Sequence, residues 1–129
     1  MRKLALYMKN RKVYAFFDYS SADRRFIEYS LNFLPEDRRE KALKYTRQVD
    51  KLNSIVGYLL LRYGLKTEYD IVDFKLGYEE CGKPYLIDHE DIHFNISHCN
   101  CGCVCILSDR PVGIDIQDIT DVSDDVICA

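Results

Sequence analysis

Residues 93–118, HFNISHCNCGCVCILSDRPVGIDIQD, predict three extended segments in close succession. The first runs from His93 to His98, the second is the apolar run from Gly102 to Leu107, and the third runs from Val112 to Ile119. Short apolar runs bounded by polar turns are typical of strands. We therefore expect this part of the chain to form strands that carry polar groups to one place.

The third segment shows the clearest alternation of apolar and polar residues. Val112, Ile114 and Ile116 alternate with Gly113, Asp115 and Gln117. A strand here would bury one face and point Asp115 and Gln117 from the other. A carboxylate and an amide oxygen two residues apart suit a hard cation with oxygen ligands, such as Mg²⁺. An ordinary solvated strand face gives the same pattern, so both interpretations stay open on these residues alone.

Four of the six cysteines recur at every second residue: Cys99, Cys101, Cys103 and Cys105. On a strand, this spacing puts all four on one side. Structural zinc sites separate paired thiols by two to four residues, so a separation of one does not predict zinc. No secretory signal favours disulfides either. We interpret the four as small buried side chains, and we interpret Cys81 and Cys128 as free thiols.

Length and composition predict one soluble domain, since the chain has 129 residues of which 47% are hydrophobic. No apolar run approaches the roughly 20 residues of a membrane span, and the apolar part of the N-terminus is too short for a signal peptide. We therefore expect a cytoplasmic protein that does not engage a membrane.

Charge is distributed unevenly along the chain. Residues 1–66 hold 15 of the 18 lysines and arginines but only 7 of the 21 acids. A basic half favours an anionic ligand, and an acidic half favours a cation or a basic partner. Two ordinary solvated surfaces that differ in charge remain the alternative. The overall pI of about 5.6 disfavours a nucleic acid as the partner.

The first third of the chain predicts scaffold elements. Lys3 to Met8 and Val13 to Phe17 are expected to form a hairpin with Asn10 in its turn. Ser20 and Asp23 resemble a capping box that begins a helix over the following apolar positions.

Two further helices and a strand are expected before residue 77. One helix starts at Leu34-Pro35, and the next is capped by Asp50 and stopped by Gly64. Its core stripe is Leu52, Ile55, Val56, Leu59, Leu60 and Tyr63. The strand is predicted over Ile71 to Leu76 and leads into a loop.

Three ordered motifs carry a resemblance to a known family. Gly82-Lys83-Pro84, then Phe94-Asn95-Ile96-Ser97-His98, then Pro111 to Gln117 resemble the motif set of the surfactin-type 4'-phosphopantetheinyl transferases. The resemblance runs from about Leu34 to Ile119. It implies an α+β fold, a single α/β subdomain with a mostly antiparallel sheet packed on helices. That subdomain is expected over residues 1–119, with residues 120–129 as the start of a linking helix or tail.

The resemblance also implies a reaction and its participants. The family transfers 4'-phosphopantetheine from coenzyme A to a serine of an acyl, peptidyl or aryl carrier protein, with Mg²⁺ as the metal. The implied coenzyme A residues are Arg38, Lys41, Ser54, Lys83, Pro84, Ser97 and His98, and the implied metal ligands are Asp115 and Gln117. Gln117 stands where the family usually has Glu, and Asn53 stands where it often has Arg.

One family signature has no counterpart in this sequence. The chain contains no tryptophan and ends at Ala129, so it lacks the Trp-x-x-Lys-Glu-Ala-x-x-Lys motif of the family's second half. We therefore expect it to correspond to the N-terminal half, and we assign no catalytic residue because the general-base region belongs to the other half. A separately encoded C-terminal half would complete it. The chain alone is expected to form a homo-oligomer, which would cover the exposed interface but still lack the missing signature. The alternative is a non-catalytic coenzyme A or nucleotide-binding remnant or interaction domain.

Overall fold

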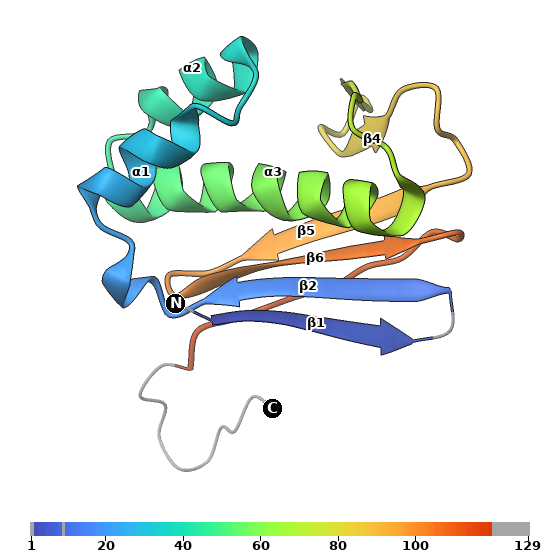
Figure 1. Cartoon of the computed structure of the whole chain (residues 1–129), viewed down its shortest axis with the longest axis horizontal. Helices are drawn as coiled ribbons and strands as arrows, with labels where there is room; N and C mark the ends of the chain where they lie inside the picture. Colours follow the sequence, from blue (N-terminus) through green and yellow to red (C-terminus); the bar gives the residue numbers. More distant parts are fainter. Residues whose placement is uncertain (1, 9, 120–129) are drawn as a thin grey trace.

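The computed structural model describes residues 2–8 and 10–119 and shows an antiparallel sheet with helices on one face (Figure 1). Helix α3 packs against the sheet, and α1 and α2 pack on α3 (Figure 1). The helices are α1 (Arg24–Leu31), α2 (Glu36–Lys44) and α3 (Gln48–Tyr69), with a short 3-10 helix η1 (Tyr19–Ser21). The strands are β1 (Arg2–Met8), β2 (Arg11–Phe17), β3 (Leu76–Tyr78), β4 (Pro84–Leu86), β5 (His93–His98) and β6 (Gly102–Ser108). The predicted α+β fold is confirmed.

The main sheet has the order β1-β2-β6-β5 with every neighbouring pair antiparallel. The predicted hairpin of β1 and β2 is confirmed, and Asn10 occupies its turn with a φ of 61°. Asn is one of the few side chains that tolerate this left-handed conformation. Because β5 is the last strand in the order, one of its edges is open to whatever follows β6 in the chain.

Helix α3 runs past both of its predicted ends. Its N-cap is Arg47 rather than Asp50, and it continues beyond Gly64 to Tyr69, where Asp70 adopts a φ of 54°. Gly64 is a packing residue, because a Cβ atom placed there would lie 2.2 Å from Leu107 Cδ1 on β6. The missing side chain lets the helix approach the sheet closely at this point.

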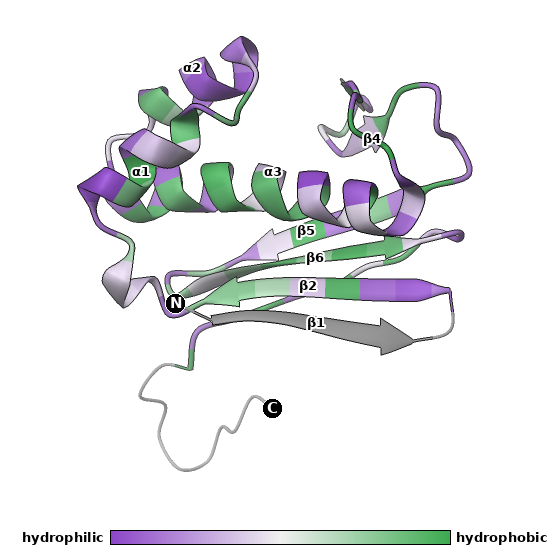
Figure 2. Cartoon of the chain, viewed as in Figure 1, coloured by the Kyte–Doolittle hydropathy of each residue, from purple (hydrophilic) through white to green (hydrophobic). Residues whose placement is uncertain are grey.

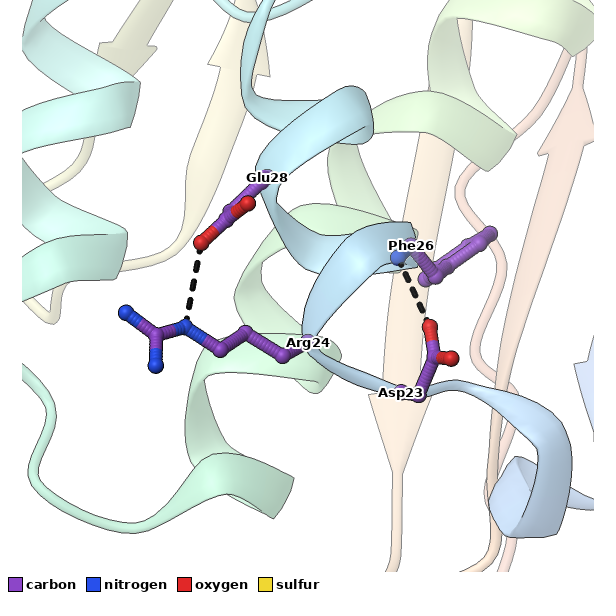
Figure 3. Close-up of polar contacts among 4 residues, drawn as sticks. All are labelled: Asp23, Arg24, Phe26 and Glu28. Atoms are coloured by element: carbon purple, nitrogen blue, oxygen red, sulfur yellow. Dashed lines mark hydrogen bonds and ion pairs between the residues drawn. The ribbon is translucent and has the colours of Figure 1, made fainter.

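Of the two shorter helices, only α1 has a side-chain cap at its N-terminus. Asp23 caps α1, since its carboxylate accepts the Phe26 N–H at 3.0 Å, and Arg24 pairs with Glu28 one turn on at 3.0 Å (Figure 3). The expected cap at Ser20 is wrong, because that residue belongs to η1 and donates its hydroxyl to Asp18. Helix α2 follows Pro35, as the sequence predicts.

Two predicted strands do not form. Residues 71–75 are irregular, because Ile71 and Phe74 pack against the core from a loop and pairing starts only at Leu76. Residues 109–119 form an extended segment that returns along β5, and we call it the return segment. Its Ile114 and Ile116 N–H groups donate to the side chains of Asn95 (3.0 Å) and Ser97 (3.1 Å) instead of to a backbone ladder.

The cysteine prediction is half right. Cys103 and Cys105 are fully buried in β6, which is apolar along most of its length, whereas α2 is mostly hydrophilic (Figure 2). Cys101 is exposed and Cys99 only half-buried, because β6 starts at Gly102 and both residues lie before it.

None of the described helices is long and apolar enough to cross a membrane. The tail predicted over residues 120–129 lies outside the described residues.

Candidate functional site

A groove of about 240 Å³ lies where α2, α3, the β3–β4 pair and the end of β5 meet. Helix α2 contributes Arg38 and Lys41, α3 contributes Ser54 and Tyr58, and the small sheet contributes Tyr78 and Pro84. Phe94, Ile96 and His98 of β5 form the remaining wall. The groove therefore combines cations, aromatic rings and hydroxyl groups from five elements between α2 and β5.

Arg38 and Lys41 share one face of α2 because they stand three residues apart. The Arg38 guanidinium lies over the Tyr58 ring, 5.6 Å from its centroid, and donates from Nη2 to the Ser54 carbonyl oxygen at 3.3 Å. Lys41 Nζ lies 5.8 Å from the centroid of the Tyr78 ring. These cation–π contacts hold both positive charges at the groove.

Tyr58 supplies a neutral aromatic wall for this site. Burial raises the pKa of its phenol above the ordinary value, while the charges of Arg62 and Arg38 act in the opposite direction. The ring therefore remains uncharged at physiological pH. Tyr58 and Tyr78 were not among the residues predicted from the sequence, although Tyr58 stands four residues after Ser54 and so faces the same side of α3.

Two buried polar atoms beside the groove have no hydrogen-bond partner among the described residues. They are Arg38 Nε and Ser54 Oγ. Buried donors and acceptors are nearly always paired, so two orphans next to one groove call for an explanation. A ligand with charged oxygen atoms would satisfy both, since guanidinium N–H groups and hydroxyls are strong donors to phosphate.

Strand β5 divides its side chains between two regions. Phe94, Ile96 and His98 face the groove, whereas Asn95 and Ser97 contact the return segment. Alternation along a strand requires this division. His98 therefore lines the groove, but its neighbour Ser97 is not among the residues that line it.

Ser97 instead holds Asp115 on the return segment. Its hydroxyl donates to Asp115 Oδ1 at 3.1 Å and accepts the Ile116 N–H at 3.1 Å. Gln117 Nε2 donates to Asp115 Oδ2 at 2.8 Å, so the two predicted metal ligands are in contact. The predicted alternation also holds, with Ile114 and Ile116 half-buried and Asp115 and Gln117 exposed. A cation bound by both residues requires the amide to rotate so that its oxygen faces the ion.

Lys83 does not line the groove, and Asn53 lines it with its side chain already engaged. Lys83 is exposed on the turn between β3 and β4, and its neighbours Gly82 and Pro84 line the groove in its place. Asn53 lines the groove too, but its amide is engaged within the protein. Its Oδ1 accepts from the Tyr19 hydroxyl at 2.7 Å, and its Nδ2 donates to the Cys99 carbonyl oxygen at 2.9 Å.

Comparison with known proteins agrees with the motif resemblance. Residues 21–110 match the family described as 4'-phosphopantetheinyl transferase, N-terminal. The chain is 29% identical over 114 residues to the 4'-phosphopantetheinyl transferase Sfp of Bacillus subtilis (strain 168), covering 87% of this chain and 51% of that protein. It is 33% identical over 102 residues to the 4'-phosphopantetheinyl transferase gsp of Aneurinibacillus migulanus, covering 78% and 42%.

A second Bacillus subtilis protein, named 4'-phosphopantetheinyl transferase, is 35% identical over 83 residues, which cover 63% of this chain and 37% of that protein. The chain therefore spans about half or less of the length of these curated relatives.

Proposed function

We propose that this chain, which belongs to the 4'-phosphopantetheinyl transferase family, binds coenzyme A. It then takes part in transferring the 4'-phosphopantetheine arm to a serine of a carrier protein. The groove between α2, α3 and β5 is the coenzyme A site in this proposal. Residues 1–119 act as the family's N-terminal subdomain, and the return segment supplies the metal ligands.

The two orphan polar atoms carry the proposal. Arg38 Nε and Ser54 Oγ are buried without partners at a groove that Lys41 also lines. A phosphate of coenzyme A placed between them would satisfy both atoms and meet two positive charges. Charge-assisted hydrogen bonds of this kind are about twice as strong as neutral ones.

The proposed reaction is a phosphoryl transfer. The carrier serine hydroxyl attacks the phosphorus that bears the pantetheine arm, the bond from that phosphorus to the bridging oxygen breaks, and 3',5'-ADP leaves. We assign no described residue as the acceptor of the hydroxyl proton. The contribution of this chain is to hold the diphosphate in place, and positioning together with charge stabilisation accounts for most catalysis in this class.

Asp115 and Gln117 fit a magnesium ion by their donor chemistry. A carboxylate that is already held by Ser97 and an adjacent amide offer the oxygen ligands that Mg²⁺ prefers. When bound, the ion would neutralise diphosphate charge and polarise the attacked phosphorus. Ser97 and His98 are consecutive residues, so this segment and the groove meet at the end of β5.

Calorimetry with coenzyme A and dephospho-coenzyme A tests the binding proposal. We expect the chain to bind coenzyme A more tightly, and we expect the double variant Arg38→Ala, Lys41→Ala to lose about 2–4 kcal/mol, since two charge-assisted contacts disappear. The matched control, Arg24→Ala with Lys44→Ala, removes the same charge from residues outside the groove lining. Equal affinity for the two ligands, or equal loss in the control, contradicts the phosphate assignment.

Transfer to an apo-carrier protein tests the catalytic part. We expect transfer when a C-terminal half of the family is added in trans, and we expect little without it. Coenzyme A binding with no transfer under either condition would favour the non-catalytic binding domain.

Homo-oligomer formation by the chain alone also remains a prediction, and light scattering at high concentration checks it.

A further inference from the structure

The turn that joins β5 to β6 brings two thiols and a carboxylate together. Cys99 Sγ and Cys101 Sγ lie 3.5 Å apart, and a carboxylate oxygen of Asp118 on the return segment completes the group. All three ligand atoms lie within 4.8 Å of one another. Cys101 is exposed and the other two residues are half-buried, so an ion from solvent can reach them.

Backbone contacts fix this turn from several sides. The Cys99 N–H donates to the Gly102 carbonyl oxygen at 2.9 Å, and the Asp18 N–H donates to the Cys101 carbonyl oxygen at 2.8 Å. The Asn100 N–H donates to Asp118 Oδ2 at 3.0 Å, which docks the return segment on the turn. The ligands are therefore held in place by contacts that do not involve their sulfur atoms, and such preorganisation favours binding.

The spacing of the sulfur atoms matches a tetrahedral ion. Zn–S bonds of about 2.3 Å in tetrahedral geometry place two sulfurs about 3.8 Å apart. A one-residue separation on a regular strand would not achieve this, but Cys101 precedes β6 and the chain reverses between the two thiols. The turn therefore removes the objection that the sequence spacing raises.

We propose that Cys99, Cys101 and Asp118 form a binding site for a thiol-preferring divalent cation of the Zn²⁺ type, with water as the fourth ligand. Two thiolates select such a cation, whereas the all-oxygen pair of Asp115 and Gln117 suits Mg²⁺. The site joins the β5–β6 turn to the return segment only three residues beyond Asp115. A bound ion stabilises the docked position of the segment that carries the proposed magnesium ligands.

Titration with Cd²⁺ tests the site, because cadmium–thiolate bonds produce a charge-transfer absorption in the ultraviolet. In a non-thiol reductant, we expect saturation at one ion per chain, release of protons from the thiols, and displacement by Zn²⁺ but not by excess Mg²⁺. Cys99→Ser and Cys101→Ser should each weaken binding on the order of tenfold to 100-fold. Asp118→Asn should weaken it less, and Cys81→Ser, at an exposed thiol on the β3–β4 turn, should leave it unchanged.

Alkylation of the unmutated chain provides a second readout that does not depend on the variants folding. Bound Cd²⁺ should protect Cys99 and Cys101 from iodoacetamide, as located by mass spectrometry, while Cys81 stays reactive. Absence of a saturable thiolate absorption would overturn the proposal. Equal alkylation of Cys99 and Cys101 with and without Cd²⁺, or binding that survives the Cys99→Ser, Cys101→Ser double change, would do the same.

Discussion

The side-chain amide of Asn53 on α3 donates to the carbonyl oxygen of Cys99 across 2.9 Å, tying the long helix to the end of the edge strand. Its carboxamide oxygen accepts from Tyr19, and the residue is 6% exposed. The family resemblance implies that an arginine often stands at this position. Here the residue secures the protein's own turn, and its amide supplies both the donor and the acceptor of that bridge.

Replacing Asn53 by alanine should lower the free energy of unfolding by about 2–4 kcal/mol, since the Tyr19 hydroxyl and the Cys99 carbonyl lose their partner in a buried place. Denaturant unfolding measures the loss. Tyr19→Phe is the matched variant, because it removes only one of the two hydrogen bonds and should cost about 1 kcal/mol. Unfolding midpoints that coincide for Asn53→Ala and the unmutated chain would show that the bridge contributes nothing.

Gly64→Ala should destabilise the protein even though alanine favours helices. The gain in helix propensity is about 1 kcal/mol, whereas forcing a methyl group against the fully buried Leu107 and Tyr14 costs about 1–3 kcal/mol. Thermal unfolding should show a lower midpoint. At Gly57 the nearest atom would be Ile96 Cγ2 at 3.2 Å, so Gly57→Ala should cost less. A stabilised Gly64→Ala protein would contradict the close approach of α3 to β6.

Substituting each of the two proposed magnesium ligands should change the metal dependence of coenzyme A binding, in opposite directions for the two variants. Gln117→Glu adds a charged oxygen and should tighten Mg²⁺, and Asp115→Ala should abolish the metal-dependent part of the affinity. Calorimetric titrations of coenzyme A at graded Mg²⁺ concentrations measure both effects. Asp73→Ala, at an exposed loop position, is the control. An unchanged Mg²⁺ dependence in Asp115→Ala would mean that the carboxylate does not bind the ion.

Thiol reactivity should divide the described cysteines by burial. Burial raises the pKa of the Cys103 thiol to about 12, and burial also raises that of Cys105, so neither forms the nucleophilic thiolate near pH 8. The pKa of the Cys101 thiol is raised to about 11, chiefly by its hydrogen bond with Cys99. Cys101 should therefore react more slowly than exposed Cys81. Timed alkylation read by mass spectrometry should label Cys103 and Cys105 only after unfolding. Rapid labelling of Cys105 in the folded chain would contradict the burial of this residue in the core.

The sequence was a good guide wherever local pattern and burial agree. Apolar runs located β5 and β6, and Asn10 located the hairpin turn. It misplaced the ends of α3, because Gly64 usually ends helices but here serves a contact with Leu107 some forty residues away. Such a contact is a property of the packed structure, and no local pattern contains it.

Site prediction shows the same division. Arg38, Lys41, Ser54, Pro84 and His98 all line one groove. Spacing in the sequence connected only Arg38 with Lys41, and the resemblance alone connected the others. Ser97 faces the other way because adjacent strand residues must alternate. The turn at Cys99 and Cys101 could not be foreseen either, since a cysteine at every second residue predicts a strand until the position of the chain reversal is known.

The return segment is anchored by side chains, and this anchoring affects how Asp115 binds an ion. Because Ile114 and Ile116 are held by Asn95 and Ser97 rather than by a ladder, the segment can open locally while the sheet stays intact. The apparent affinity of any ion bound there equals the intrinsic affinity scaled by the fraction of molecules in which the segment is docked. Substituting Ser97 should therefore change ion binding by changing this docked fraction, although Asp115 and Gln117 themselves are not substituted.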